Sequence, residues 1–133
     1  MSNIGLVDLI VCDESVIEEV LRLAIRVHTI LGPGLLESVY EHAVLFELLE
    51  VNLQAQRQVE IPVMYRGNDL GVGFRADMIV ANSLLLEFKT VDRISDIHLA
   101  QTITYLKLLK FKRGLILNFN AKLLKEGIKR VSI

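Results

Sequence analysis

The most informative stretch of this chain is residues 74–90, which read FRADMIVANSLLLEFKT. Two apolar runs, 78–80 and 84–86, flank the polar pair Asn82-Ser83, which is typical of two strands joined by a tight turn. Charged residues interrupt both strands: Asp77 lies in the first, and Glu87 and Lys89 lie in the second. Because an unpaired buried charge is costly, we expect these side chains to pair or to bind a cation.

The register of this hairpin decides whether the charged side chains meet. A two-residue turn would pair Asp77 with Phe88, and directly paired residues lie on the same side of a sheet, so Asp77 would face away from Glu87. A three-residue connection at 81–83, or a β-bulge near Asp77, would instead place Asp77 on the face of Glu87. We predict one of these two arrangements, with Lys89 beside the two carboxylates.

An acid on one strand and an acid-x-lysine triplet on the next indicate a metal site. Carboxylate oxygens are preferred ligands of Mg²⁺ and Mn²⁺. A lysine beside them can position or deprotonate an attacking water and neutralise charge in the transition state. The simpler interpretation is that Lys89 only forms salt bridges with Asp77 and Glu87. The triplet alone is a very weak signal, and the aspartate one strand earlier strengthens it.

Periodicity around the hairpin predicts an α/β fold. Helical spacing predicts a helix from Asp13, its N-cap, to Leu31, and a second helix over about 35–50. Alternation predicts strands at 55–63, 70–80 and 84–90, followed by a helix from Ser95 or Asp96 to about Lys110 and a buried strand at 114–118. The segment 122–133 is ambiguous, with a helical turn and an edge strand at 128–131. The apolar run 4–11 reads as a short strand or lead-in segment.

Composition predicts one soluble domain over residues 1–133, since 52% hydrophobic and 23% charged residues are typical of a folded chain. The mean hydropathy of +0.43 is high. It reflects either a well-filled core or an apolar face reserved for a second copy in a homo-oligomer, and the sequence leaves both open. The single cysteine, Cys12, makes a reducing, cytoplasmic location the expected one. We find no secretory signal or membrane-spanning run.

Charge is unevenly distributed along the chain. Residues 1–100 hold 7 Lys/Arg against 15 Asp/Glu, whereas residues 101–133 hold 8 Lys/Arg against the single acid Glu126. From charge alone, a solvated surface is the favoured interpretation of the basic third. The alternative is a phosphate-binding face near the metal site. It would be formed by Lys107, Lys110, Lys112 and Arg113, or by the tail 122–130.

These motifs resemble the PD-(D/E)xK nuclease-like superfamily and, within it, the small bacterial GxxExxY proteins. The pattern that names the latter group is found at residues 34–40, GLLESVY. The similarity continues through 75–77, 87–89, 101–106 and 114–119, in the expected order, while Ala76 replaces the proline of the superfamily motif. The resemblance implies an αβββαβ core with a mixed central sheet flanked by helices, and a nuclease-type site.

The resemblance also implies roles for individual residues. The metal ligands would be Asp77, Glu87 and Glu37; Lys89 would be the catalytic lysine; and Gln101 and Tyr105, a Q-x-x-x-Y pair on one helical face, would support the site. The simpler interpretations are that Glu37 is an exposed helix acid and Tyr105 a core residue. Glu37 and Glu41 stand at i,i+4, a repulsive spacing unless a cation lies near one of them.

The predicted function is therefore a Mg²⁺- or Mn²⁺-dependent nuclease that hydrolyses phosphodiester bonds in DNA rather than RNA. The alternative is a non-catalytic module that binds nucleic acid or a protein and retains a nuclease fold. The intact Asp77, Glu87 and Lys89 favour the first interpretation. The small size of the chain and the lack of a dedicated DNA-binding domain favour the second.

Overall fold

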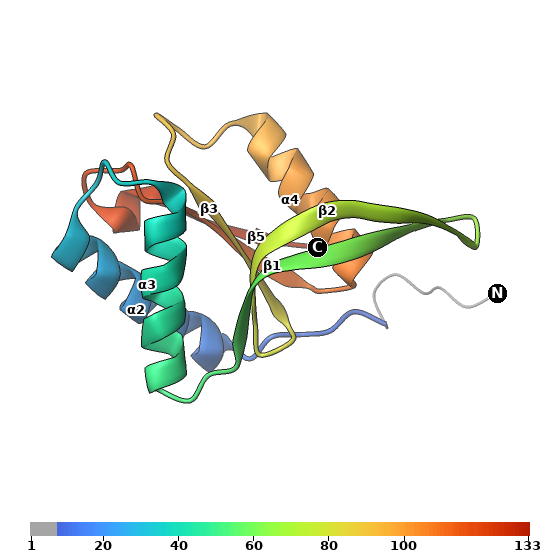
Figure 1. The fold of residues 1–133 in the computed structure, drawn as a ribbon, viewed down its shortest axis with the longest axis horizontal. Helices are drawn as coiled ribbons and strands as arrows, with labels where there is room; N and C mark the ends of the chain where they lie inside the picture. Colours follow the sequence, from blue (N-terminus) through green and yellow to red (C-terminus); the bar gives the residue numbers. More distant parts are fainter. Residues whose placement is uncertain (1–7) are drawn as a thin grey trace.

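Helices α2 and α3 cover one face of a mixed five-stranded sheet, and α4 covers the other (Figure 1). The computed structural model describes residues 8–133. In chain order, the elements are α2 (Glu14–Leu31), α3 (Glu37–Glu50), β1 (Ala55–Tyr65), β2 (Asn68–Val80), β3 (Leu84–Lys89), α4 (Asp96–Leu109), β4 (Arg113–Asn118), the 3-10 helix η1 (Leu124–Gly127) and β5 (Ile128–Ser132). The predicted α/β fold is confirmed.

The predicted helix starts follow from local capping. The Asp13 side chain accepts a hydrogen bond from Ser15 N at 3.1 Å and begins α2. Ser95 caps α4 and forms a capping box with His98, which resolves the choice between Ser95 and Asp96. Of the apolar run 4–11, residues 4–7 lie outside the described residues, and Ile10 forms an isolated bridge with Phe111. No helix within residues 8–133 is both long and apolar enough to cross a membrane.

The sheet has the strand order β1-β2-β3-β4-β5, and only β3 and β4 are parallel. Alternating residues of β3 face two separate cores. Leu86 and Phe88 pack against α2 and α3, while Leu85 packs with the apolar residues beneath α4. This alternation buries β3 on both faces, so the charged side chain of Glu87 is enclosed within the fold.

The sheet forks where β2 and β3 separate. β2 pairs with β1 along most of its length but with β3 only through Met78, Ile79 and Val80. Beyond that point, the β1–β2 hairpin leaves the sheet as a long arm (Figure 1). Residues 64–73 of this arm are all exposed. The fork places Asp77 and Glu87 where the two strands part.

The high mean hydropathy arises from a filled core and also from exposed apolar side chains. Two clusters of buried hydrophobic residues lie on the two faces of the sheet. On the outer side of α2 and α3, Ile30 is 73% exposed and Phe46 is 62% exposed. These two residues, with Val27, Leu31, Ala43 and Glu47, line a shallow apolar groove.

Candidate active site

The β2–β3 connection has the three-residue form. Val80 pairs with Leu84, and Ser83 N donates a hydrogen bond to Val80 O at 3.1 Å. Ala81 and Asn82 have φ of 52° and 49°, both in the left-handed region. Positive φ in a hairpin turn matches the right-handed twist of the strands that it joins. The pairs Met78–Leu86 and Ile79–Leu85 continue the same register, so the next opposed residues are Asp77 and Glu87. The register prediction is confirmed.

The carboxylates of Asp77 and Glu87 each accept a backbone hydrogen bond from the opposite strand across the fork. Asp77 N donates to Glu87 Oε2 at 3.1 Å, and Phe88 N donates to Asp77 Oδ2 at 2.8 Å. These side-chain acceptors satisfy two backbone N–H groups at the point where the regular ladder stops. Both carboxylates are therefore fixed in position by the backbone of the opposite strand.

Both carboxylates are held in a protein interior that disfavours their charge. Glu87 is only 4% exposed. Burial first, and then the neighbouring Asp77 charge, raise the pKa of Glu87 to about 8. Burial likewise raises the pKa of Asp77 to about 6, although the Phe88 hydrogen bond opposes this shift. The two acids thus form a buried pair for which a bound cation would be the natural compensation.

Lys89 is half-buried at the end of β3, two residues from Glu87 on the same side of the strand. Its positive charge lowers the pKa of both Asp77 and Glu87. It nevertheless forms no ion pair with either carboxylate within residues 8–133. The salt bridges that the simpler interpretation expects are therefore not formed among the described residues. The ammonium group of Lys89 lies near the two carboxylates and forms no ion pair with any described side chain.

Glu37 is the first residue of α3, and its Oε2 accepts a hydrogen bond of 3.3 Å from Thr90 Oγ1, one residue beyond β3. Its charge contributes to the raised pKa of Asp77, after that of Glu41. Within residues 8–133, no three His, Cys, Asp or Glu side chains lie close enough together to hold a metal ion among them. The fold therefore assembles Asp77 and Glu87 closely and places Glu37 at the rim.

The two residues of the predicted Q-x-x-x-Y pair on α4, Gln101 and Tyr105, lie in different environments. The Tyr105 ring stacks on Phe74 of β2, with ring centroids 3.9 Å apart and planes 3° from parallel. Burial and the charges of Glu87 and Asp77 raise the pKa of its hydroxyl, so Tyr105 lies near the acid pair. Gln101 is exposed and forms no side-chain hydrogen bond within the described chain. His98 Nδ1 accepts a hydrogen bond from Ser95 N at 3.0 Å, a capping role.

A polar cluster that the sequence did not predict lies on the α3 side of the fork. Glu41, only 4% exposed, accepts hydrogen bonds on Oε1 from Arg57 at 3.0 Å and from Gln58 at 2.8 Å. Arg57 is thus the cation that the Glu37–Glu41 spacing required. Gln58 has φ of 53°, a conformation that alternating polarity cannot reveal. The one available signal was the spacing of the two glutamates.

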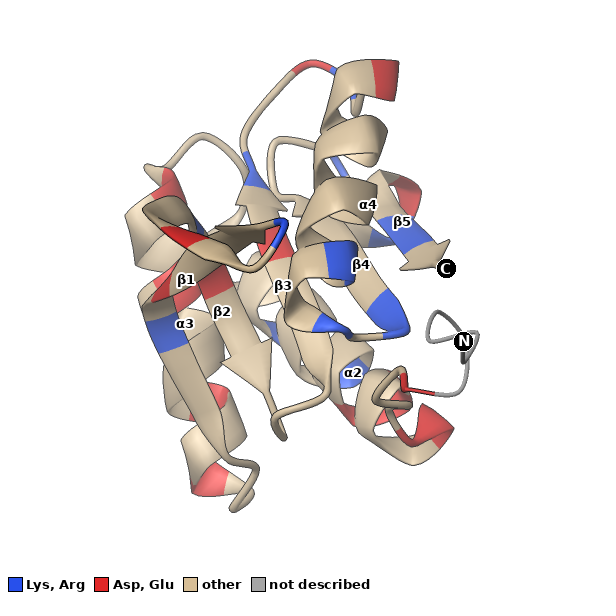
Figure 2. Cartoon of the chain, turned by 90° about the vertical axis from the view of Figure 1, so that its right-hand side faces the viewer, with Lys and Arg blue, Asp and Glu red and all other residues tan. Residues whose placement is uncertain are grey.

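Part of the basic C-terminal third lies far from the acid pair. Arg113 and Arg130 both form ion pairs with Glu14, each at 2.7 Å. Arg113 pairs with Leu84, whereas Lys89 pairs with Asn118, so Arg113 is at the opposite end of these parallel strands. Figure 2 shows basic positions gathered at the C-terminal end of α4 and the adjoining start of β4. The prediction that Arg113 lines the approach to the site is wrong, because the parallel crossover carries it to the far edge.

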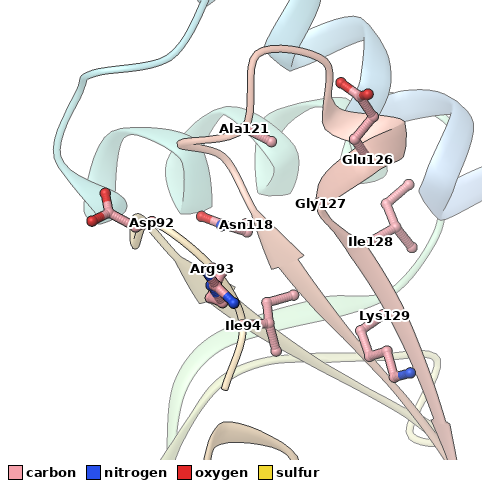
Figure 3. A pocket seen from close by; sticks show the side chains of 9 residues that line it. All are labelled: Asp92, Arg93, Ile94, Asn118, Ala121, Glu126, Gly127, Ile128 and Lys129. Atoms are coloured by element: carbon pink, nitrogen blue, oxygen red, sulfur yellow. The ribbon is translucent and has the colours of Figure 1, made fainter. Parts of the chain in front are cut away.

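A pocket of ≈ 320 Å³ opens at the Lys89 end of the sheet. Figure 3 shows Asp92, Arg93 and Ile94 on one wall and residues 126–129 on the other. Asn118, at its floor, accepts a hydrogen bond from Val91 N at 3.1 Å and donates one to Val91 O at 2.8 Å, which fixes the loop that follows β3. Arg93 and Lys129 form no ion pair within residues 8–133.

Comparison with known proteins identifies a family. A family model described as the PD-(D/E)XK nuclease superfamily matches residues 14–131, nearly the whole of the described chain. Neither the curated proteins nor the solved structures provide a match.

Proposed function

This chain belongs to the PD-(D/E)XK nuclease superfamily, and from this premise we propose that it hydrolyses phosphodiester bonds in DNA with the help of Mg²⁺ or Mn²⁺. The observation that carries the proposal is the joining of Asp77 and Glu87 across the fork, with Lys89 beside them and in no ion pair within residues 8–133. Within the superfamily, the proposal assigns the chain to the GxxExxY group, on the motif at residues 34–40.

The donor set fits a hard divalent cation. Asp77 and Glu87 offer oxygen ligands, which Mg²⁺ and Mn²⁺ prefer, and backbone hydrogen bonds hold both carboxylates. Mg²⁺ usually keeps several waters and is held by one or two carboxylates together with substrate phosphate, so a pair of carboxylates can serve it. When bound, the ion would polarise the scissile phosphate and lower the pKa of the attacking water.

The protein side chains supply the remaining chemistry. The ammonium of Lys89, which forms no ion pair within the described chain, would orient the water and neutralise the charge that develops on the phosphate. Tyr105, held against Phe74, would present its hydroxyl to the backbone of the nucleic acid. Glu37 at the rim stays the proposed auxiliary metal ligand, and the exposed Gln101 would orient groups around the pair.

The path proposed for the nucleic acid follows the cations at the Lys89 end of the sheet. Arg93 and Lys129 line the pocket beside that end, and neither forms an ion pair within residues 8–133. Guanidinium and ammonium groups bind phosphates through charge-assisted hydrogen bonds. Lys129, which belongs to the predicted tail 122–130, and Arg93, which the sequence did not single out, are therefore the proposed phosphate contacts.

A cleavage assay tests the proposal. Single- and double-stranded DNA and RNA are incubated with the protein and Mn²⁺ or Mg²⁺, beside matched EDTA controls and the Glu87→Ala variant. Cleavage of DNA by the wild type that is lost in EDTA and in the variant is expected. Cleavage that persists in Glu87→Ala would indicate a contaminating nuclease. DNA binding without turnover by the wild type would favour the alternative, a non-catalytic binding module.

A further inference from the structure

The arm of the β1–β2 hairpin grows out of the same strand that carries Asp77. Asp77 lies nine residues after Asn68, the first residue of β2. At about 3.3 Å per residue, the tip of the arm is therefore about 30 Å from the acid pair. One turn of B-DNA, about 10 base pairs, occupies about 34 Å. A duplex that binds at Asp77 and Glu87 and runs along the arm would meet the tip nearly one helical turn away.

The turn at the tip of the arm places an arginine where the backbone disfavours it. Tyr65 pairs with Asn68, so Arg66 and Gly67 form a two-residue turn with φ of 50° and 82°. Hairpin turns with positive φ at both central residues favour Asn, Asp or Gly at the first of them. The Arg66 side chain is exposed and forms no ion pair within residues 8–133. Its strained position therefore points to a partner of the guanidinium outside the fold.

Apolar side chains lie exposed along the arm behind this turn. Four of them are 57–62% exposed, namely Met64, Tyr65, Leu70 and Val72. Apolar groups gathered on an exposed surface mark a site of interaction. The arm is also narrow, because Gly71 and Gly73 carry no side chain, and a Cβ at Gly73 would lie only 1.8 Å from Val63 Cγ2. A narrow two-stranded ribbon of this kind fits the major groove of B-DNA, which is about 12 Å wide.

The edges of the arm are protected against pairing with a strand of a second copy. β1 is an edge strand of the sheet, and the register shifts on both sides of Pro62. In the part of β2 beyond the fork, Gly71 has φ of 90° and interrupts the extended backbone. Proline and bulges on an exposed edge hinder the addition of another strand. The exposed side chains of the arm therefore suit a partner that they contact directly, rather than one that extends the sheet.

Cations on the same side of the molecule complement a phosphate backbone. The arm projects to the right in Figure 1, and Figure 2 views the molecule from that side, with basic positions at the C-terminal end of α4. Lys107 and Lys110 at this end are exposed and form no ion pair within residues 8–133. On the arm itself, the Asp69 carboxylate accepts a hydrogen bond from Gly71 N at 2.8 Å, so it serves the local backbone. Phosphate contacts from α4 can orient a duplex beside the arm.

We propose that the arm enters the major groove of duplex DNA, with Arg66 hydrogen-bonded to base edges and the exposed apolar side chains packed against bases and sugars. The inference rests on the proposed function, because it takes the acid pair as the place where the scissile phosphate binds. It also narrows the substrate to double-stranded DNA that extends about one turn from the cleaved bond. The major groove of A-form RNA is too deep and narrow for side chains to reach its bases.

DNA binding in EDTA, where no metal-dependent cleavage occurs, tests the inference. Fluorescence anisotropy compares the wild type with Arg66→Asn, which removes the guanidinium but accepts the left-handed backbone of the turn. On a DNA duplex of about 20 base pairs, the Kd should rise about 10-fold in the variant, the usual effect of losing one base contact. A stem of about 6 base pairs is only about 20 Å long and cannot join the acid pair to the tip. Both proteins should therefore bind the short stem equally.

Controls separate groove binding from effects on charge, folding and assembly. Arg22→Gln also removes an exposed arginine, on a helix that lies away from the arm in Figure 1, and should keep the wild-type Kd. Arg66→Asn should melt no lower than the wild type, because asparagine tolerates positive φ. The double variant Tyr65→Ser, Leu70→Ser should bind the long duplex more weakly, while sedimentation equilibrium should give it the same mass as the wild type.

Failure of the inference and failure of the proposed function give different results. Equal Kd values for the wild type and Arg66→Asn on the long DNA duplex, or an equal loss on duplex RNA, would overturn groove entry and leave the nuclease proposal in place. A wild-type dimer that the double variant dissociates would assign the arm to a second copy and also overturn it.

Two further results concern the proposed function. Binding of the long duplex through Arg66 without cleavage in Mn²⁺ would overturn the nuclease and leave the arm as a DNA-binding element. No DNA binding by the wild type at low salt would overturn both. A loss of affinity in Arg66→Asn that is confined to the long DNA duplex, with an unchanged Kd in Arg22→Gln, is the result that supports the inference.

Discussion

The backbone amide of Asp77 donates a 3.1 Å hydrogen bond to the Glu87 carboxylate, which joins the two acids at the point where β2 and β3 part. The Asp77 carboxylate in turn accepts a 2.8 Å hydrogen bond from Phe88 N. The two side chains thus close the fork in place of a backbone ladder, and backbone hydrogen bonds hold both carboxylates. Pre-positioning of this kind is what a metal or catalytic site requires.

Replacement of the three central residues should separate metal binding from turnover. Asp77→Asn and Glu87→Gln should abolish Mn²⁺-dependent DNA cleavage, because each removes a carboxylate of the pair while keeping an oxygen for the fork. Lys89→Ala should retain Mn²⁺ binding but lose about 10²–10³ in rate, the usual effect of removing one electrostatic stabiliser. Single-turnover cleavage and calorimetry measure the two effects. Glu60→Ala, an exposed acid on β1, is the control. Loss of Mn²⁺ binding in Lys89→Ala would contradict the assigned role.

Stability of the metal-free protein should fall as the pH rises. The pKa values of Asp77 and Glu87 are raised on folding from 3.8 and 4.5, so above these ordinary values the native state binds more protons than the unfolded chain. Their stabilising contribution is complete below the ordinary values and is lost as the pH rises through about 6 for Asp77 and about 8 for Glu87. Melting in EDTA at pH 4.5–8.5 should show a steeper decline for the wild type than for Glu87→Gln. Excess Mg²⁺ should restore the melting temperature at high pH. Parallel curves of melting temperature against pH for the two proteins would show that Glu87 is not a buried acid with a raised pKa.

Binding of duplex DNA should depend on the cations at the Lys89 end of the sheet. Arg93→Ala and Lys129→Ala should each weaken binding and lower the slope of log K against log salt by about 0.9 for each phosphate that the variant no longer neutralises. Arg113→Ala should leave the slope unchanged, because that residue is paired with Glu14 at the opposite strand ends. Fluorescence anisotropy over a salt series in the Lys89→Ala background measures the slopes. A larger change in Arg113→Ala than in Arg93→Ala would contradict the proposed path.

The stacked rings of Phe74 and Tyr105 should couple the arm to α4. A double-mutant cycle of Phe74→Ala and Tyr105→Ala should give an interaction energy of about 0.5–1.5 kcal/mol, the usual value for an aromatic pair. Urea unfolding measures the four stabilities. Tyr105→Phe keeps the stack and should preserve stability while lowering cleavage, since it removes only the hydroxyl. Additive effects of the two alanine substitutions would show that the rings contribute no mutual stabilisation.

Local patterns determined most of the secondary structure. Asp13 and Ser95 begin helices because their side chains accept backbone N–H groups that the first helical turn leaves unpaired. Period-two alternation predicted the three consecutive antiparallel strands β1, β2 and β3. The first two extend further into the arm than predicted, because β1 ends at Tyr65 and β2 begins at Asn68. The second helix starts at Glu37 rather than near Leu35. Boundaries of this kind depend on turn geometry, which hydrophobic periodicity does not encode.

The sequence by itself predicted the acid pair and the condition for its assembly, since an even register is needed to set Asp77 opposite Glu87. Tertiary structure decided the rest. The left-handed turn at Ala81 and Asn82 selected that register, and the parallel β3–β4 crossover moved Arg113 to the far edge. The strained backbone of Gln58 brought Arg57 and Gln58 together on Glu41. Side-chain periodicity is a one-dimensional signal, whereas these relationships depend on φ angles and on contacts between residues distant in the sequence.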